Sequence, residues 1–175
     1  ISKLEKKYPE YESLKQKKKA IVIHDLQKNL DPSQAILHYF FNFNSFYIFY
    51  IDKDTFELSY APIEREYSNK LLAFRKNFEE YVYGDFSKAT IDRFSKQSYE
   101  LYKQFIKPFE QLIGDKRLFI IPDAELGLIP FEALCTEDPN SFRITSFSDI
   151  PYLVLNNPVS YLFSVYQLQE SSDIK

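Results

Sequence analysis

The sequence predicts an α/β fold built on a mixed sheet, with an antiparallel aromatic meander, two long helices and a central parallel strand. Three aromatic and β-branched runs, separated by turn residues, follow one another within residues 36–62, which is typical of paired antiparallel strands. Helical periodicity replaces this pattern over residues 67–113. A continuous apolar run at residues 118–121 comes next, and such runs are typical of parallel strands that are covered on both faces.

The composition is that of a packed globular chain. Of the 175 residues, 45% are hydrophobic and 18% aromatic, and only three are Gly. A chain of this size can bury enough surface to fold without a disulfide or a structural metal. The single cysteine, Cys135, cannot form an internal bridge, and it excludes the cysteine-rich zinc patterns.

Net charge and hydropathy argue against two classes of partner. The formal charge is -3, which argues against a general nucleic-acid surface. No apolar run approaches the ~20 residues that a membrane span requires, and the first residues lack a signal-peptide core. We therefore expect a cytoplasmic chain with no nucleic-acid partner and no membrane partner in this segment. Because the chain begins with Ile1 rather than Met, we also expect it to be a piece of a longer polypeptide.

Charge is unevenly distributed along the chain. Residues 1–19 hold seven Lys against three Glu, whereas residues 122–175 hold eight acidic residues against Arg143 and Lys175. The simpler interpretation is a solvated, lysine-rich helix end followed by an acidic domain face. The alternative is that the two ends steer a partner or align neighbouring modules.

Residues 1–20 are interpreted as a linker or as the tail of a preceding helical repeat region, and residues 21–175 as the folded domain. Apolar residues recur in the first segment near the helical period, although Pro9 interrupts it. Residues 20–23 are candidates for a short strand. Residues 24–30 predict one or two helical turns, which the following Asp-Pro pair would end.

The meander and the two helices follow from their hydrophobic periods. Strands are expected at residues 36–41, 46–51 and 56–62. One apolar helical stripe spans residues 67–81, and Gly84 can end that helix. A second long helix is expected over residues 91–113, with Pro108 kinking it or starting a new segment, and with Gly114 at its end.

The last third of the chain predicts two more strands. Residues 118–121 should form the central parallel strand, so we expect Phe119→Ala to cost ~3–5 kcal/mol, as the loss of a buried aromatic side chain does. Pro130 suits the first position of a helical turn. Residues 137–149 read as a polar loop, and residues 159–163 as another short strand. A capping box at residues 164–167 then predicts the start of a helix.

No residue pattern predicts a catalytic, cofactor or metal site. Cys135 follows the apolar residues of a short predicted helix, where a buried structural thiol is the expected state. His24 stands at a strand-to-helix junction and His38 within a predicted strand, so neither is an evident base for the thiol. The three glycines are isolated from one another, which excludes a glycine-rich phosphate loop. We therefore expect no cofactor.

The carboxylates are interpreted as structural or solvated. Three acidic pairs lie in turns or on polar helix faces: Asp52 with Asp54, Glu79 with Glu80, and Glu137 with Asp138. Nothing near them suggests the apolar pocket that acid catalysis requires. Asp123 follows the central strand, at the end of the sheet where α/β proteins often place functional groups. We expect its side chain to cap the following turn.

Two neighbouring motifs together resemble a known family. Leu-Phe-Ile-Ile-Pro-Asp at residues 118–123 and Leu-Gly-Leu-Ile-Pro-Phe-Glu-Ala-Leu at residues 126–134 resemble the signature of the CHAT domain, a caspase-like domain usually found behind tetratricopeptide repeats. The segments at residues 101–102, 151–153 and 159–161 occur in the same order as in that family. The resemblance covers the chain from about Ile21 to its end.

The resemblance implies a caspase-like sheet and a place in the clan of caspases and separases. Its cysteine peptidases use a His-Cys dyad that lies downstream of the segments matched here. Neither dyad motif occurs in this chain, so no catalytic residue is carried over, and the resemblance implies an N-terminal, pseudo-protease portion. In related two-lobed proteases such a portion supports the active half and couples it to helical repeats.

Three functional hypotheses remain. The first is a non-catalytic scaffold within a bacterial CHAT-type peptidase, with the C-terminal peptidase half and the helical repeats as its partners. The second is a protein–protein interaction module with no peptidase activity, and the third is an unrelated small enzyme that uses Cys135. A strand edge or an apolar surface left for a missing half predicts a tendency of the isolated piece to self-associate.

Overall fold

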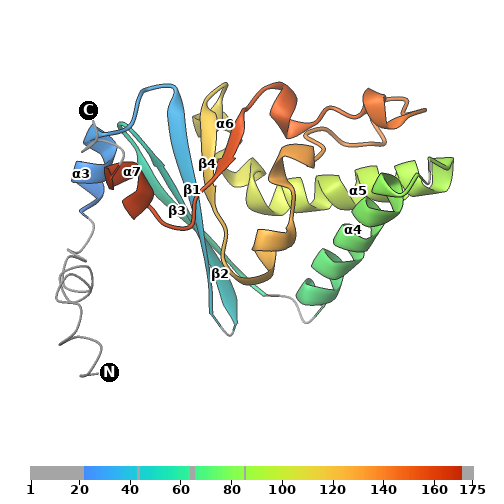
Figure 1. Cartoon of the computed structure of the whole chain (residues 1–175), viewed down its shortest axis with the longest axis horizontal. Coiled ribbons are helices and arrows are strands. Elements are labelled where there is room, and N and C mark those ends of the chain that lie inside the picture. Colours follow the sequence, from blue (N-terminus) through green and yellow to red (C-terminus); the bar gives the residue numbers. More distant parts are fainter. Residues whose placement is uncertain (1–21, 43, 64–65, 85, 171–175) are drawn as a thin grey trace, which may run out of the picture.

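In a computed structural model, the structure describes residues 22–170 apart from 43, 64–65 and 85. One five-stranded sheet, in the order β3-β2-β1-β4-β5, separates two sets of helices (Figure 1). Its strands are β1 (Gln34–Phe41), β2 (Ser45–Asp52), β3 (Phe56–Pro62), β4 (Arg117–Ile121) and β5 (Val159–Tyr161). The predicted α/β class with a mixed sheet is confirmed.

The sheet combines antiparallel and parallel pairing. β1, β2 and β3 form the predicted antiparallel meander, with Leu37 opposite Tyr50 and Tyr47 opposite Tyr60. β4 lies between β1 and β5 and is parallel to both, with Ile120 opposite Leu37 and Tyr161. The predicted parallel strand is therefore an interior strand of the sheet.

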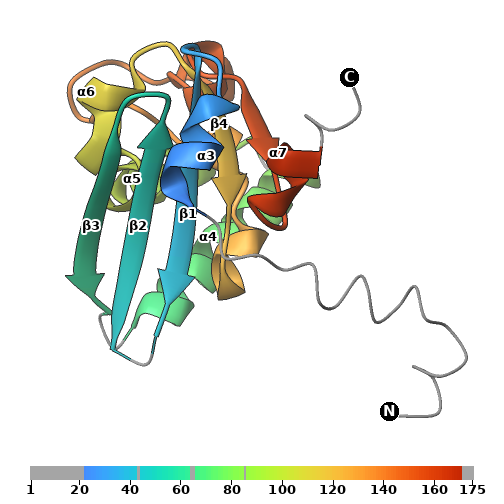
Figure 2. The same ribbon diagram turned by 90° about the vertical axis from the view of Figure 1, so that its left-hand side faces the viewer.

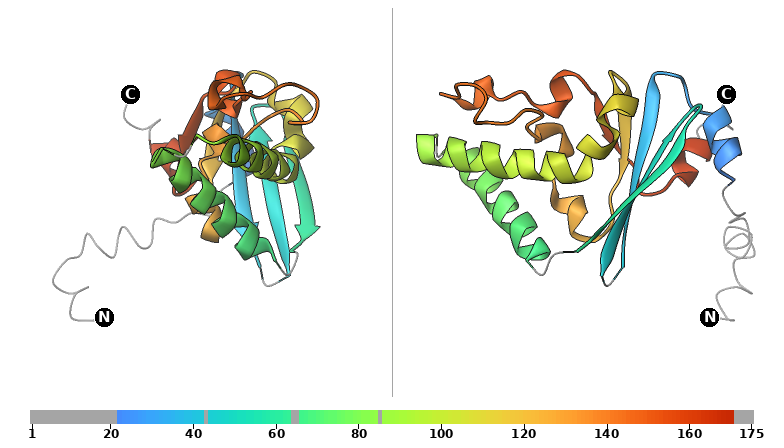
Figure 3. Two further views of the ribbon diagram at one scale, coloured as in Figure 1. Left: turned by 90° about the vertical axis from the view of Figure 1, so that its right-hand side faces the viewer. Right: turned by 180° about the vertical axis from the view of Figure 1, so that it is seen from behind.

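Two long helices cover one face of the sheet. They are α4 (Tyr67–Val82) and α5 (Lys88–Phe105), which lie together on the same side (Figure 3). Buried side chains at helical spacing, such as Leu71 and Phe74 on α4 and Phe94 and Phe105 on α5, pack against the apolar residues of β1, β2 and β4. This layer is the main core.

Two short helices lie on the opposite face. They are α3 (Ile23–Lys28), which lies in front of β1, and α7 (Tyr166–Glu170), which lies toward the β5 side of the sheet (Figure 2). Leu26 and Val165 pack there against Ile36, Ile51 and Ile121. Among the described residues, none of the helices combines the length and the apolar character needed to cross a bilayer.

The second long helix is interrupted where proline was expected to interrupt it. α5 ends at Phe105, and the chain continues through η1 (Lys107–Phe109) and α6 (Glu110–Ile113) to Gly114, whose φ is 53°. Pro108 lacks the N–H that a continuous helix needs. The remaining short elements are the 3-10 turns η2 (Ala124–Leu128), η3 (Phe131–Ala133), η4 (Phe147–Asp149) and η5 (Leu153–Leu155).

Three details of the sequence prediction are wrong. The proposed strand at residues 20–23 lies partly outside the described residues, but Val22 is in no strand and Ile23 begins α3. A further strand could not pair with β1, because β2 and β4 flank it on both sides. The segment forms a helix instead, and its buried residue Leu26 packs against the sheet. Cys135 is extended and bridges Tyr152 rather than lying on a helix. The strand expected at 159–163 ends at Tyr161.

The proposed linker at residues 1–20 lies outside the described residues. The loop expected at residues 137–149 is mostly irregular, but it includes η4 and buries Phe147 against Phe94 of α5, with ring centroids 5.6 Å apart. Because Phe147 is buried there, this part of the loop belongs to the main core.

Candidate functional site

The carboxyl ends of β1 and β4 meet at Asp123. One of its carboxylate oxygens accepts the backbone N–H of Phe41 at 2.8 Å, and the other accepts the N–H of Ala124 at 2.9 Å. Ala124 has a φ of 49°, in the left-handed region that a non-glycine residue seldom adopts. The predicted turn cap is confirmed, and the same carboxylate also joins the ends of two strands by bonding Phe41, which lies 82 residues away in the sequence.

The thiol of Cys135 is enclosed in the main core. The residue is 0% exposed, its N–H donates to the Ser98 hydroxyl at 2.7 Å, and its thiol donates to the carbonyl of Glu137 at 3.2 Å. Burial raises the pKa of this thiol. Because the thiolate is the nucleophile, Cys135 is in an environment that suppresses its reactivity.

The two histidines lie away from that thiol. His38 is half-buried on β1, on the sheet face opposite the main core, with its ring centroid 6.1 Å from that of Phe49. Burial lowers its pKa, and the charge of Asp123 opposes this shift. His24 is exposed on α3. The sheet therefore separates Cys135 from His38, and they form no nucleophile–base pair.

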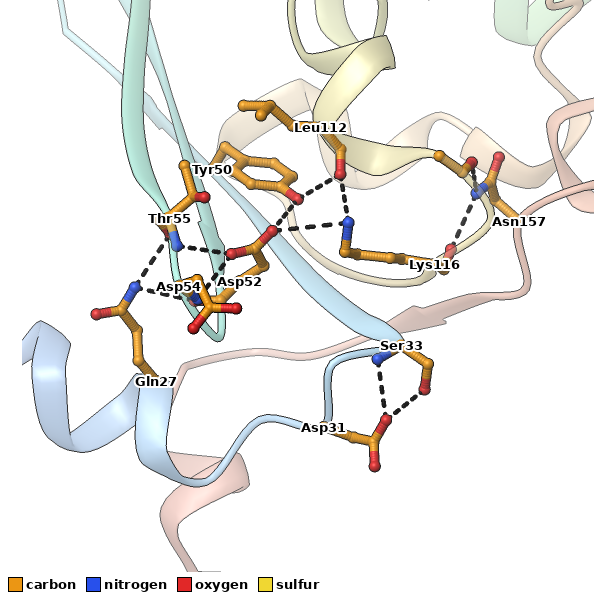
Figure 4. Close-up of polar contacts among 11 residues, drawn as sticks. Gln27, Asp31, Ser33, Tyr50, Asp52, Asp54, Thr55, Leu112, Lys116 and Asn157 are labelled. Carbon is orange, nitrogen blue, oxygen red and sulfur yellow. Dashed lines mark hydrogen bonds and ion pairs between the residues drawn. The ribbon is translucent and has the colours of Figure 1, made fainter.

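A buried polar network, not foreseen in the sequence, lies at the other end of the sheet (Figure 4). Asp52 was expected to be a solvated turn residue, but it is only 7% exposed. One of its oxygens accepts the Tyr50 hydroxyl at 2.7 Å and lies 3.7 Å from the ammonium of Lys116. The other accepts the backbone N–H groups of Asp54 at 3.0 Å and Thr55 at 2.7 Å.

This network joins the β2–β3 hairpin to the start of β4. The Tyr50 hydroxyl also lies 2.8 Å from the carbonyl of Leu112, to which Lys116 donates as well. Asn157 donates to the carbonyls of Gly114 and Lys116, both at 2.9 Å. Every polar atom named here has a structural partner, so the network serves folding. In the sequence, only the Asp-x-Asp-Thr turn at residues 52–55 indicated that Asp52 could accept backbone hydrogen bonds.

A second unforeseen contact joins two of the CHAT-like motifs. Tyr161 on β5 donates to a carboxylate oxygen of Glu132 at 2.5 Å, and its hydroxyl accepts the N–H of Phe131 at 2.8 Å. Burial, together with the Glu132 hydrogen bond, raises the pKa of the Tyr161 phenol well above its ordinary value. The Pro-Phe-Glu-Ala-Leu segment is thereby fastened to the edge strand of the sheet.

The acidic pair on α4 and a groove beside that helix contain no catalytic arrangement. Glu79 and Glu80 form exposed ion pairs with Arg75 and Arg93. A groove of about 900 Å³ lies between α4, α5 and the end of β3, and its rim includes Lys103, which pairs with Glu100 at 2.7 Å. Within the part of the chain that the structure describes, no cluster of three His, Cys, Asp or Glu side chains could hold a metal ion.

Comparison with known protein families gives a match over the C-terminal part of the chain. Residues 95–175 match the family model of the CHAT domain, a span that begins within α5 and includes β4, β5 and both motifs joined by Tyr161. A search of the curated proteins finds no match. The chain therefore contains a fragment of a CHAT domain.

Proposed function

We propose that this chain is the non-catalytic, N-terminal portion of a CHAT-type cysteine peptidase. It supports the peptidase half of the parent protein and couples that half to helical repeats, in the cytoplasm. A single reduced cysteine suits that compartment. The coupling to repeats rests on the family resemblance.

The observation that carries the proposal is the separation of the thiol from the imidazoles. Cys135 is buried in the main core, where its N–H donates to Ser98 of α5, whereas His38 lies on the opposite face of the sheet. A cysteine peptidase needs a base within hydrogen-bond reach of its thiol. The geometry therefore does not favour peptide hydrolysis by this chain alone, and it favours a scaffolding role.

The β5 edge of the sheet suits a supporting role. β5 is parallel to β4 and has no further strand beside it among the described residues. Parallel strands are normally covered and paired on both sides, and an open edge pairs readily with another strand. Phe163, two residues beyond β5, is 98% exposed. We propose that the peptidase half adds its sheet to this edge and covers Phe163.

The test is reconstitution from separate pieces. The residues that follow Lys175 in the parent reading frame should contain a His-Gly strand end and a later Cys. Expressed separately, that half should bind this chain, and Phe163→Lys should weaken the binding by about tenfold or more, since a charge would replace a desolvated aromatic contact. Tyr83→Lys, at a residue that directly follows α4 and is 87% exposed, should leave the binding unchanged. Equal binding by both variants would refute the β5 docking.

The purified chain should hydrolyse no peptide. Hydrolysis that disappears in Cys135→Ala would contradict the proposed function and would favour the small-enzyme hypothesis.

The second candidate function is an interaction module with no proteolytic partner. It is favoured by an aromatic face on β1, β2 and β3, where Phe40, Phe56 and Tyr60 are 50%, 46% and 70% exposed. Exposed apolar patches of this kind often bind proteins. A parent reading frame without the His-Gly and Cys motifs would select this function over the first.

A further inference from the structure

The β3 strand has seven residues and exposes apolar side chains, and within the part of the chain that the structure describes it is the outer strand at the edge opposite β5. Phe56, Leu58 and Tyr60 point to one face, with 46%, 49% and 70% of their surface exposed. Long apolar edge strands are templates for pairing with another strand, and proteins usually protect them with charge or proline. The only charged residue in β3 is Glu57.

The hydrogen-bond pattern identifies which backbone groups of β3 point outward. Thr55 accepts from Asp52, and Ile63 donates to Asn44, so these two residues are bonded across to the β2 side. Bonding alternates along an antiparallel strand, which assigns Glu57, Ser59 and Ala61 to β2. The N–H and C=O groups of Phe56, Leu58 and Tyr60 therefore face away from the sheet.

We propose that β3 pairs with β3 of a second copy of this chain, antiparallel and across a two-fold axis at Leu58. Each copy would place Leu58 opposite Leu58 of the partner subunit, and Phe56 opposite Tyr60 of the partner subunit. All three outward residues would then exchange both backbone hydrogen bonds with the residue opposite. The two sheets would become one continuous sheet.

Charge and proline select this register over its neighbours. An axis at Glu57 would place two like charges directly opposite each other, which is destabilising. An axis at Ser59 would place Phe56 opposite Pro62 of the partner subunit, and proline has no N–H to donate. With the axis at Leu58, Glu57 lies opposite Ser59 of the partner subunit, and Pro62 falls outside the paired segment.

The aromatic side chains are also complementary in this register. Within one chain, Phe49 stacks on Phe56 with ring centroids 6.3 Å apart and planes at 15°, and Tyr47 stacks on Tyr60 at 6.2 Å and 27°. Pairing Phe56 with Tyr60 of the partner subunit joins one stack to the other. Cross-strand aromatic pairs are among the more stabilising pairs in sheets.

The oligomeric state of residues 1–175 tests the proposal. Sedimentation velocity over a wide range of concentration should show a monomer–dimer equilibrium. Leu58→Lys should raise the dimer dissociation constant about tenfold or more, because two ammonium groups would meet at the axis. Leu58→Glu should act similarly alone, and a mixture of the two variants should restore dimers. Tyr83→Lys, which adds the same charge away from the edge, should dimerise like the parent chain.

Cysteine cross-linking tests the register in a Cys135→Ala background. Leu58→Cys should form a disulfide-linked dimer on oxidation, because residues opposite each other lie within disulfide range. Phe56→Cys and Tyr60→Cys should cross-link when mixed, and neither should do so alone. A parent chain that is monomeric throughout, or dimers indifferent to Leu58→Lys, would overturn the proposal. So would self-linking of Phe56→Cys in place of the mixed pair.

Discussion

The carboxylate of Asp123 accepts the backbone N–H of Phe41 at 2.8 Å. This bond joins the carboxyl end of β4 to the carboxyl end of β1, beyond the paired residues where the antiparallel meander meets the parallel half of the sheet. The same side chain caps the turn at Ala124. Asp123 is thus occupied by structural contacts at the end of the sheet where α/β enzymes often place reactive groups.

Replacing Asp123 should destabilise the fold measurably. Asp123→Ala removes the acceptor for two backbone N–H groups, and we expect a loss of roughly 1–3 kcal/mol. Asp123→Asn retains one acceptor oxygen and should cost less. Urea unfolding followed by circular dichroism measures both. Identical midpoints for Asp123→Ala and the parent chain would mean that the bond between β1 and β4 contributes nothing.

The interior strand β4 should be most sensitive on its main-core side. Ile120 is 0% exposed and packs in that core, so Ile120→Ala should cost about 2–5 kcal/mol. Phe119 points to the opposite face and is only half-buried. Phe119→Ala should therefore cost less than Ile120→Ala, and less than the ~3–5 kcal/mol expected of a fully buried aromatic. Denaturant unfolding of the two variants gives the order, and the reverse order would contradict it.

Asp52 should make stability depend on pH in the acid range. Burial alone would raise the pKa of this carboxyl, but the Tyr50 hydroxyl, the two turn N–H groups and Lys116 together hold it below its ordinary value of 3.8. A carboxyl whose pKa is lower in the folded state stabilises the fold above its unfolded pKa, and this stabilisation disappears as the pH falls through the folded pKa.

The variant Asp52→Asn should therefore be less stable than the parent chain near neutral pH, and the difference should shrink below pH 3.8. Denaturant unfolding at a series of pH values measures this difference. Asp54→Asn is the matched control, since Asp54 is an exposed residue of the same turn. A constant difference between Asp52→Asn and the parent chain across the acid range would contradict the prediction.

The Cys135 thiol should react slowly in the native chain. Its burial and raised pKa keep the thiolate scarce and shielded, so a disulfide reagent should modify it quickly only after unfolding. A cysteine introduced by Leu155→Cys in a Cys135→Ala background provides the exposed reference, because Leu155 is 69% exposed. Native Cys135 reacting as fast as this reference would indicate an accessible, activated thiol.

Tyr67 should tolerate loss of its hydroxyl. The residue is 5% exposed, and within the described part of the chain its hydroxyl has no hydrogen-bond partner. A buried unpaired hydroxyl costs free energy, so Tyr67→Phe should unfold at an equal or higher denaturant concentration than the parent chain. Phe74→Leu is a useful comparison, since it alters a 0% exposed ring and should destabilise. A marked loss of stability in Tyr67→Phe would show that the hydroxyl has a partner in solution.

Much of the fold could be predicted from local patterns. Alternation over residues 36–62 predicted β1, β2 and β3 nearly to the residue, and helical spacing predicted α4 and α5. Pro108 and Gly114 marked where the second helix is interrupted and ends, because both act through their own backbones. The CHAT motifs likewise consist of adjacent residues, and they predicted the CHAT match over residues 95–175.

Contacts between distant segments could not be predicted in this way. Nothing near Asp52 in the sequence indicates that Lys116 lies beside its carboxylate or that the Leu112 carbonyl accepts from Tyr50, because both contacts depend on the packing of α6 beside the hairpin. Packing of distant segments also sets the order of the strands and the hydrogen bond from Tyr161 to Glu132. It likewise places Cys135 and His38 on opposite faces of the sheet. The sequence by itself determined most of the helices and strands, the turn cap at Asp123 and the CHAT match, because periodicity, capping and motifs depend on neighbouring residues. Only the tertiary structure decided which side chains meet and which of the described strands lie at the edges of the sheet, because those outcomes depend on how the whole chain buries its apolar surface.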